Sequence, residues 1–219
     1  MVQMKKALIF GATGFVGSRL LNELLSSSDY GEVTAVARRK LGIVHTKLRA
    51  LVGDYNSLPA LKADLVGDEI FIALGTTRKA TPDKADYYRV DHDYPVLAAR
   101  IAKEQGARAV FLVSAVGANP HSKVFYVRTK GETERDIVAL GFEHTHLFRP
   151  SMIMGNREEY RPLEKMFIAA FRAINPLLVD GLDKYRGMTG DDIARAMLRS
   201  ATIETGKVNI YHWREMRLL

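Results

Sequence analysis

Three glycines spaced three residues apart, placed directly after the first apolar run of the chain, constrain the fold more than any other feature. The run from Lys6 to Phe10 is followed at once by the segment GATGFVG, which extends from Gly11 to Gly17. Apolar residues then recur with helical spacing between Phe15 and Leu25. A strand that turns through small residues into a helix can hold a pyrophosphate, because the unpaired amides and the dipole at a helix N-terminus favour an anion.

The glycine spacing differs from the G-x-G-x-x-G pattern of dinucleotide-binding proteins in the place of the first turn glycine. A tight turn that binds no ligand is therefore the alternative. The strand before the turn and the amphipathic helix after it favour a phosphate site, with the last glycine allowing the helix to pack closely on the strand. We predict that the turn contributes these cofactor-binding residues: Gly11, Thr13, Gly14, Phe15, Val16 and Gly17.

The apolar pattern alternates between strands and helices along the rest of the chain. Further strands are predicted at Val33–Ala37, Leu48–Val52, Glu69–Leu74, Ala109–Val113, Thr145–Phe148 and Val208–Tyr211. Further helices are predicted at Tyr87–Gln105, Phe125–Leu140, Leu163–Ile174 and Asp191–Thr202. This alternation with apolar strands implies an α/β fold with a Rossmann-type, doubly wound parallel sheet. No linker divides the chain, so we expect one domain over residues 1–219, with a small substrate-side cap after about Pro150.

The composition is that of an ordinary globular chain. Hydrophobic residues make up 47% and charged residues 26% of the chain, which disfavours a disordered or fibrous protein. The net charge of +7 favours anionic partners, yet the basic residues are scattered, so nucleic acid is not an expected partner. No apolar run is long enough for a membrane span or a signal peptide, and cysteine is absent, so we expect a cytoplasmic protein.

The end of the second predicted strand bears on the choice of cofactor. An NAD-specific site offers an Asp or Glu there to the ribose 2′-hydroxyl group. This chain has Arg38 and Arg39 instead, and a guanidinium suits the 2′-phosphate of NADP(H). We predict both arginines as cofactor-binding residues, with NADP(H) preferred and NAD(H) possible. The alternative is that they are solvated charges at a strand end.

Two later strand ends would complete the cofactor cleft, because ligands of open α/β sheets lie beyond the carboxyl ends of the strands. Asp54 could meet an adenine amino group, although an exposed turn aspartate is a close alternative. Ala73, Leu74 and Gly75 follow the next strand, where small residues again let the backbone approach a cofactor.

Ser114, Tyr126 and Lys130 are the candidate catalytic residues. Ser114 follows a predicted central strand, and the other two stand four residues apart on the next helix, so they share one face. This spacing arises readily by chance, and the position after the serine strand is what supports the prediction. Ser114 would hold the substrate oxygen, Tyr126 would exchange its proton, and Lys130 would lower the tyrosine pKa and touch the nicotinamide ribose.

These residues and several longer segments resemble a known superfamily. GATGFVG, Ser114 and YVRTK are similar to the glycine motif and the Ser-Tyr-Lys set of the extended or atypical short-chain dehydrogenases/reductases. LGTTRK, VDHDY, LVSAVGAN, YVRTKGE and FRPSMIMGNREE together resemble the Tat-interacting-protein-like oxidoreductases, from the first strand to about Tyr160. The resemblance implies a Rossmann fold and NADP(H) binding through the matched residues Gly11, Gly14, Gly17, Arg38, Ser114, Tyr126 and Lys130.

The chain also departs from the superfamily pattern. Asp91 stands where many members carry a catalytic asparagine, in the helix before the serine strand. The chain is shorter than the extended members, which leaves little sequence for a substrate domain. The resemblance further implies that some relatives act as regulators, so dinucleotide binding and turnover are separate properties.

The sequence thus leaves competing functions. The first is an NADP(H)-dependent oxidoreductase that acts on a small carbonyl or alcohol substrate, with Tyr126 as the acid/base. The alternative is a non-catalytic, NADP(H)-sensing regulatory protein that binds a protein partner. A sugar-nucleotide epimerase is the weakest hypothesis, because it normally needs a larger substrate domain. Substrate, reaction direction and oligomeric state are left open.

Three smaller signals are consistent with structural roles. His144 and His146 alternate along a strand, but no cysteine or carboxylate cluster accompanies them, so no metal site is predicted. Arg149 could frame the substrate side at the end of a strand, where the following proline serves equally well as a strand terminator. The helix at Leu163–Ile174 is expected to face the core.

Overall fold

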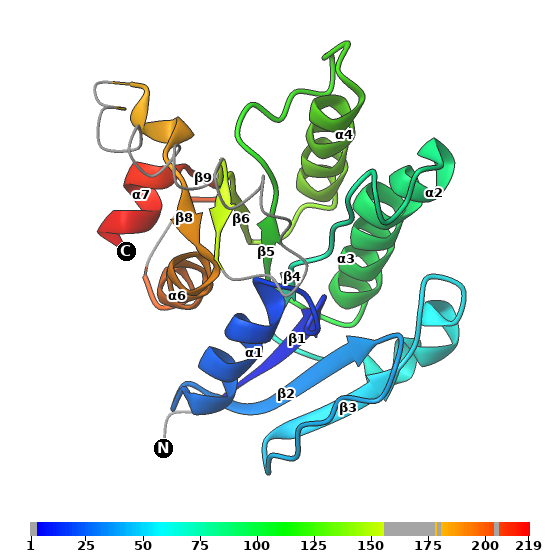
Figure 1. The fold of residues 1–219 in the computed structure, drawn as a ribbon. Helices are drawn as coiled ribbons and strands as arrows, with labels where there is room; N and C mark the ends of the chain where they lie inside the picture. Colours follow the sequence, from blue (N-terminus) through cyan, green and yellow to red (C-terminus); the bar gives the residue numbers. More distant parts are fainter. Residues whose placement is uncertain (1–3, 156–177, 179–180, 204–205) are drawn as a thin grey trace.

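The computed structural model describes residues 4–155, 178, 181–203 and 206–219. Within these residues seven parallel strands form one sheet in the order β3-β2-β1-β4-β5-β6-β9 (Figure 1). The strands are β1 (Lys5–Phe10), β2 (Tyr30–Ala37), β3 (Leu48–Val52), β4 (Glu69–Ile72), β5 (Ala109–Val113), β6 (His144–Phe148) and β9 (Val208–Tyr211). Each predicted strand is present, and the parallel sheet is confirmed.

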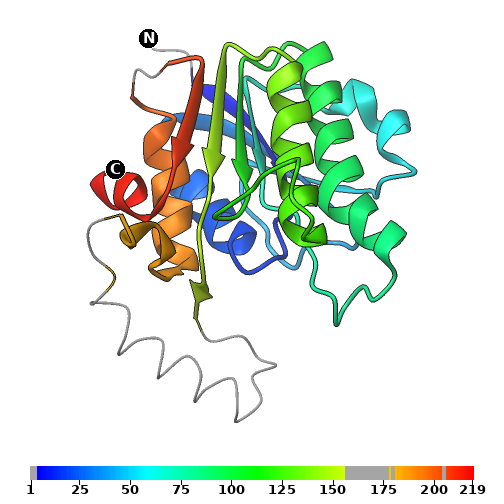
Figure 2. The ribbon, with the colours of Figure 1, turned by 90° about the horizontal axis from the view of Figure 1, so that it is seen from above.

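Helices cover both faces of this sheet (Figures 1 and 2). α1 (Gly17–Ser26) and α6 (Gly190–Ser200) pack side by side on one face, with α7 (Trp213–Leu218) against α6. α3 (Tyr94–Glu104) and α4 (Phe125–Ala139) cover the other face. Each face buries its own apolar cluster, so water is excluded from both sides of the strands, as predicted for a doubly wound fold.

The strand order reverses between β1 and β4, and this reversal places the candidate site. β1 pairs with β2 on one side and with β4 on the other, and all three strands run parallel. The chain leaves β1 for α1 on one face of the sheet and leaves β4 for α3 on the opposite face. Such a reversal leaves a crevice beyond the carboxyl ends of the two strands, where open α/β sheets bind their ligands.

The prediction of one helix at Tyr87–Gln105 is wrong about where the helix starts and about its continuity. It begins earlier, as α2 (Lys84–Tyr88), passes through one π-helical turn, η2 (Arg89–Asp93), and continues as α3. The Asp83 carboxylate caps α2 by accepting two backbone amide protons of its first turn, at 2.8 and 2.9 Å. The exposed polar residues of α2 carry no apolar pattern, which is why apolar spacing missed this turn.

Two boundaries at the site also differ from the prediction. α1 begins at Gly17 rather than at Phe15, and β4 ends at Ile72 rather than at Leu74. Just beyond β1 and β4 the two backbones lie close together: the Ala73 amide donates to the Phe10 carbonyl oxygen at 2.9 Å, and a Cβ atom on Gly11 would lie 2.5 Å from the Ala73 carbonyl oxygen.

The residues after Pro150 contribute to the main layers as well as to a separate pair of strands. α6 belongs to one helix layer and β9 to the sheet. β7 (Ile153–Met154) and β8 (Met188–Thr189) form a separate parallel pair, and the short helix η4 (Asp183–Tyr185) precedes β8. α7 was not predicted. The helix predicted at Leu163–Ile174 lies outside the described residues. Among the helices that are described, none has the length and apolar character needed to cross a membrane.

His146 lies in the core, and its burial predicts a stability that decreases in acid. Its ring stacks on Phe111 at a centroid distance of 4.4 Å, and its Nδ1 lies 3.0 Å from the Tyr211 hydroxyl oxygen. Burial lowers the pKa of His146 from 6.5 to about 4, so the unfolded chain takes up a proton at a higher pH than the folded chain. We expect the free energy of unfolding to fall by about 3 kcal/mol as the pH drops from about 6.5 to about 4, measured by urea denaturation.

Substitution of His146 by Gln should remove much of this pH dependence. The same substitution at the exposed His121 is the matched control and should leave the dependence intact. A wild-type stability that stays flat across this pH range would contradict a neutral, buried imidazole. In the part of the chain that the structure describes, no three potential metal ligands cluster around His146 or elsewhere.

Candidate active site

The turn between β1 and α1 is built from backbone contacts that only glycine allows. Gly11 has a φ of +89°, and a Cβ atom there would lie 2.5 Å from the Ala73 carbonyl oxygen. A Cβ atom on Gly17 would lie 2.0 Å from the Gly11 carbonyl oxygen, and one on Gly14 would lie 3.2 Å from that oxygen. The end of β1, the start of α1 and the end of β4 therefore meet with no side chain between them.

This geometry fits the pyrophosphate of a dinucleotide. The Gly14 amide donates to the Gly11 carbonyl oxygen at 2.9 Å, and the Ser18 amide donates to the Gly14 carbonyl oxygen at 2.9 Å, which fixes the entry into α1. The first turn of α1 holds no acidic residue, so no carboxylate there opposes the attraction of the helix dipole for an anion. Thr13 is exposed at the turn, and Val16 packs into the core behind it.

The Phe15 ring links the glycine turn to segments that follow Pro150. A Cβ atom on Gly155 would lie 2.0 Å from the ring's Cζ, and one on Gly190 would lie 2.9 Å from its Cε1, so the ring lies directly against both glycines. The Arg19 guanidinium covers the ring at 4.0 Å from its centroid and pairs with the Asp191 carboxylate at 3.0 Å. The start of α1 is thereby tied to the start of α6.

Arg38 and Arg39 are exposed directly after β2, at the strand end where a 2′-phosphate is expected. Burial and the Asp54 carboxylate raise the pKa of the buried Tyr94 phenol to about 12, and the Arg38 guanidinium acts in the opposite direction. Arg38 follows β2, Asp54 follows β3 and Tyr94 begins α3, so charged groups from two strand ends act on the first residue of α3.

Asp54 also has a structural role. Its Oδ1 accepts the amide proton of Ser57 at 3.0 Å and the hydroxyl proton of Ser57 at 2.9 Å, just before the 3-10 helix η1 (Leu58–Asp64). These hydrogen bonds hold the pKa of the exposed Asp54 carboxyl group below its ordinary value. These contacts are typical of an aspartate in a turn. They are made by Oδ1, and Oδ2 takes no part in them.

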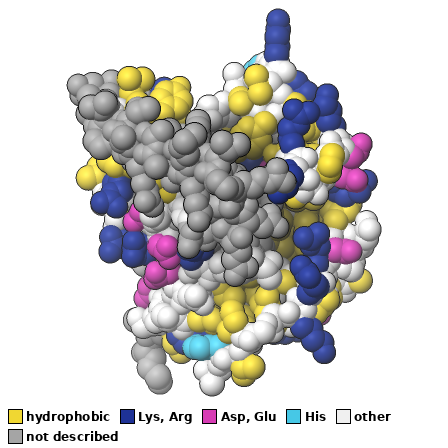
Figure 3. Space-filling view, in the orientation of Figure 1, with side chains coloured by type: hydrophobic (Ala, Val, Ile, Leu, Met, Phe, Trp, Pro, Cys, Tyr) yellow, Lys and Arg dark blue, Asp and Glu magenta, His cyan; other side chains and the backbone are white. Residues whose placement is uncertain are grey.

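Positive charge accumulates near this end of the crevice. Exposed basic residues follow the two strands that flank β1, with Arg38, Arg39 and Lys40 after β2 and Arg78 and Lys79 after β4. Figure 3 shows Lys and Arg side chains gathered along the side of the molecule that carries α2 and α3 in Figure 1. A phosphorylated ligand is attracted to a surface of this charge.

Lys130 reaches the end of β4 and meets a buried carboxylate there. Its Nζ lies 2.7 Å from the Oδ1 of Asp91, and the other oxygen of Asp91 accepts the Thr76 amide proton at 2.8 Å. A Cβ atom on Gly75 would lie 3.6 Å from the Oδ1 of Asp91 and 3.8 Å from the Nζ of Lys130. Ala73 and Leu74, which precede Gly75, are half-buried. The ammonium group therefore lies against the backbone of the predicted cofactor cleft.

Ser114 lies at the carboxyl end of β5, as predicted. Its amide donates to the Phe148 carbonyl oxygen at 2.7 Å, which continues the pairing of β5 with β6 beyond the last strand residue. The side chain is 5% exposed, and its Oγ has no hydrogen-bond partner among the described residues. A buried hydroxyl group without a partner is rare, and a ligand oxygen would satisfy it.

Tyr126 occupies the first turn of α4, one helical turn before Lys130, and it is 43% exposed. Despite this exposure, desolvation raises the pKa of its phenol above the ordinary value; the Lys130 ammonium lowers the pKa, and the Asp91 carboxylate raises it. Lys130 thus lowers the pKa of Tyr126 as expected, but the other contributions outweigh it and the pKa of the phenol is raised.

The position of α4 depends on contacts that the sequence did not indicate. A Cβ atom on Gly131 would lie 2.2 Å from the Asn119 carbonyl carbon, so the loop after β5 rests directly on the helix. The buried Glu134 carboxylate accepts two hydrogen bonds from the Arg149 guanidinium, one of them at 2.9 Å from Nε. Arg149 therefore braces α4 against the end of β6 rather than lying free to face a substrate.

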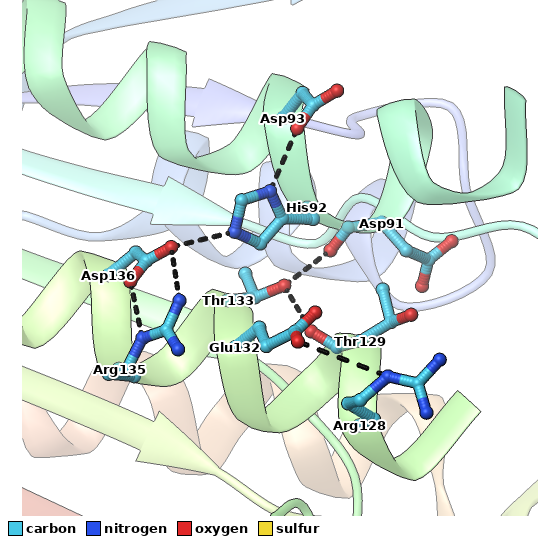
Figure 4. A network of polar contacts seen from close by, with 9 residues as sticks. All are labelled: Asp91, His92, Asp93, Arg128, Thr129, Glu132, Thr133, Arg135 and Asp136. Atoms are coloured by element: carbon cyan, nitrogen blue, oxygen red, sulfur yellow. Dashed lines mark hydrogen bonds and ion pairs between the residues drawn. The ribbon is translucent and has the colours of Figure 1, made fainter. Parts of the chain in front are cut away.

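The interface between η2 and α4 is polar, as Figure 4 shows. The Thr133 hydroxyl lies 2.9 Å from the Asp91 carbonyl oxygen and 2.8 Å from the Thr129 carbonyl oxygen. Further along the same interface, His92 lies between the carboxylates of Asp93 and Asp136, at 2.8 and 2.9 Å. These contacts fix η2 and α4 relative to each other, and so fix Asp91 relative to Lys130.

This fold and this site define a Rossmann-type NAD(P)-binding protein. The chain belongs to the NAD(P)H-binding family, whose sequence pattern it matches over residues 11–166. The chain is similar to the protein fmp52, mitochondrial, of Aspergillus fumigatus, with 37% identity over 207 residues that cover 90% of this chain and 87% of the relative. The FMP52 protein, mitochondrial, of Saccharomyces cerevisiae is 37% identical over 153 residues, which cover 68% and 66% of the two chains.

Solved structures share the fold at low sequence identity. MoeE5 in complex with UDP-glucuronic acid and NAD superposes with a TM-score of 0.71 at 22% identity, over 94% of this chain and 75% of the other. The enzyme WbmH of Bordetella bronchiseptica in complex with NAD+ gives a TM-score of 0.72 at 18% identity, over 96% and 76%.

The expected cytoplasmic location is wrong. The relatives from Aspergillus fumigatus, Eremothecium gossypii and Saccharomyces cerevisiae are all named as mitochondrial proteins, which points away from a purely cytoplasmic protein. The prediction failed because a lack of cysteine and of long apolar runs argues only against secretion and membrane insertion, and does not separate the compartments inside a cell.

Proposed function

We propose that this protein is an NADP(H)-dependent oxidoreductase of the short-chain dehydrogenase type, which transfers a hydride to or from a small carbonyl or alcohol substrate. The Ser114 hydroxyl carries the proposal, because it is buried at a strand end with no partner among the described residues. Such a group costs about 1–3 kcal/mol when it is left unpaired. A substrate oxygen beyond the end of β5 would accept its hydrogen bond.

The chain offers residues for each part of an NADP(H) molecule. The backbone of the glycine turn would hold the pyrophosphate, since three close contacts keep side chains out of it. Arg38 and Arg39 would hold the 2′-phosphate, and Asp54, which follows β3, would meet the adenine amino group. The backbone from Ala73 to Gly75, with Lys130 beside it, would face the nicotinamide ribose.

Bound NADPH supplies the hydride in the reducing direction. Ser114 holds the substrate carbonyl oxygen, and the Tyr126 phenol donates its proton to that oxygen as the alcohol forms. In the oxidising direction the same tyrosine takes the alcohol proton. Lys130 contributes a positive charge beside the phenol in both directions.

Turnover is tested by mixing the purified protein with NADPH and a panel of small aldehydes and ketones, and by following the loss of NADPH absorbance. Oxidation of NADPH that depends on one carbonyl compound would support the proposal. Tight NADPH binding with no turnover on any compound would favour the alternative, a cofactor-sensing regulator that binds a protein partner. Absence of NADPH and NADH binding would refute both.

Removal of the Arg38 guanidinium should weaken NADPH binding and leave NADH binding unchanged. A hydrogen bond to a charged group is worth about 1.5–3 kcal/mol, so we expect the NADPH Kd of Arg38→Ala to rise by about 10-fold or more. Calorimetric titration of both nucleotides measures this effect. Arg100→Ala removes the same charge from an exposed position on α3 and is the control. Equal affinities of the wild-type protein for NADPH and NADH would contradict the assignment.

A further inference from the structure

The ion pair between Lys130 and Asp91 is almost fully buried. The Lys130 side chain is 9% exposed and the Asp91 side chain is 1% exposed, with 2.7 Å between Nζ and Oδ1. Burying two charges is costly, and the cost is offset only when the geometry is good and the remaining oxygen is also bonded. Here the Oδ2 of Asp91 accepts the Thr76 amide proton at 2.8 Å, so both carboxylate oxygens have partners.

Asp91 is also held through its backbone. Its carbonyl oxygen lies 2.9 Å from the Thr133 hydroxyl, which comes from α4, the helix that carries Lys130 and Tyr126. Asp91 itself lies in the π-helical turn η2, an irregularity that proteins often place at functional sites. The carboxylate is therefore fixed against the catalytic helix from two directions.

Charged groups on two elements act on the Tyr126 phenol: Lys130 lies on the same helix, and Asp91 lies on η2. The phenol of Tyr87, on α2, is a further titratable group coupled to Tyr126, and Arg78 acts on Tyr87. A lone ammonium beside a phenol favours the phenolate, but a carboxylate 2.7 Å from the ammonium opposes this effect at the tyrosine.

We propose that Asp91 is a positioning residue that holds the Lys130 ammonium against the cofactor cleft and opposes its charge at Tyr126, so that the resting site carries a neutral phenol suited to carbonyl reduction. The consequence for the reaction rests on the proposed function. The effect of Asp91 on the pKa of Tyr126 concerns the protein without substrate and does not depend on that function. An asparagine at this position would keep the hydrogen bond to Thr76 and lose the opposing charge.

The consequence for the reaction is a preferred direction. In reduction, a hydride from NADPH forms the new C–H bond while the Tyr126 O–H bond breaks and its proton passes to the substrate oxygen. The products are the alcohol, NADP+ and a tyrosinate that recovers its proton from water. A phenol that is neutral at rest is ready for this step, whereas alcohol oxidation must first remove its proton.

The test is a spectrophotometric titration of tyrosinate in the protein without substrate. The difference between the protein and its Tyr126→Phe variant isolates the titration of Tyr126. We expect a midpoint above the ordinary value for tyrosine in the wild-type protein and a midpoint lower by about one pH unit or more in Asp91→Asn. Asp93→Asn removes the same charge from the same helix, where the carboxylate contacts His92, and should leave the midpoint unchanged.

A double variant, Asp91→Asn with Lys130→Met, completes the cycle. It removes both charges, so the midpoint of its tyrosine titration should return close to that of the wild-type protein. It also provides a test if the single variant does not fold, because the double variant has no unpaired buried ammonium. An Asp91→Asn midpoint equal to that of the wild-type protein, or a double variant far from it, would overturn the proposal. Because no turnover is needed, a failure here is distinct from a protein that never oxidises NADPH.

Discussion

Substitution of Tyr126 by Phe is expected to lower kcat by about 10²- to 10⁴-fold and to leave NADPH affinity unchanged. Positioned proton transfer contributes about this much to an enzymatic rate, and Phe keeps the ring while removing the proton. The cofactor contacts proposed for this site come from the glycine turn and the strand ends, so they stay intact. Steady-state kinetics on the best carbonyl substrate and calorimetric titration of NADPH measure the two quantities.

Tyr88→Phe is the matched control for this variant. Tyr88 is a half-buried tyrosine of α2 that stacks on His92 at a centroid distance of 4.5 Å, outside the catalytic set. Its loss of a hydroxyl group should leave kcat at the wild-type value. A Tyr126→Phe protein with a normal rate would remove the proposed acid/base mechanism, because no other group has been placed to supply the proton.

Gly17→Ala should have the second large effect, on stability and cofactor binding together. Its new methyl group would lie 2.0 Å from the Gly11 carbonyl oxygen, which is backbone and cannot turn aside. The start of α1 must then move away from β1. We expect a loss of about 3 kcal/mol in the free energy of unfolding, the upper part of the range for overpacked interiors, and a rise of at least about 10-fold in the NADPH Kd.

Gly42→Ala separates this steric effect from the general cost of replacing glycine. Gly42 is exposed, a Cβ atom there would have no other atom within 4 Å, and its backbone does not have a positive φ. Urea denaturation of the control should match the wild-type protein closely. A Gly17→Ala protein with wild-type stability and NADPH affinity would show that the turn does not hold the pyrophosphate as proposed.

The sheet could be predicted well because a parallel strand buried on both faces is apolar along its whole length. Every residue of β5 is buried, and its predicted bounds were correct. β2 begins three residues before the predicted Val33, because its first residues include Gly31 and Glu32 and so interrupt the apolar pattern. An interrupted apolar pattern thus hides the start of β2.

The candidate site could be predicted in outline for a related reason. Strand ends in a parallel sheet meet at one edge, so the sequence alone predicts that Ser114 and the glycine turn lie at the same edge. The pairing of Asp91 with Lys130 could not be predicted, since it depends on a π-helical turn in one segment and on the packing of α4. The same holds for Gly131, whose contact with Asn119 is visible only in three dimensions.

The pairing of β6 with β9 sets a constraint on how the molecule assembles. Thr145 pairs with Val208 and Phe148 with Tyr211, so one side of β6 is completed by residues that are synthesised much later. Until they emerge from the ribosome, a nearly finished sheet exposes the backbone of β6, and such an open edge can pair with another chain. Long-range closure of this kind slows folding. A nascent chain halted before Val208 should therefore depend on chaperones more than the finished protein does.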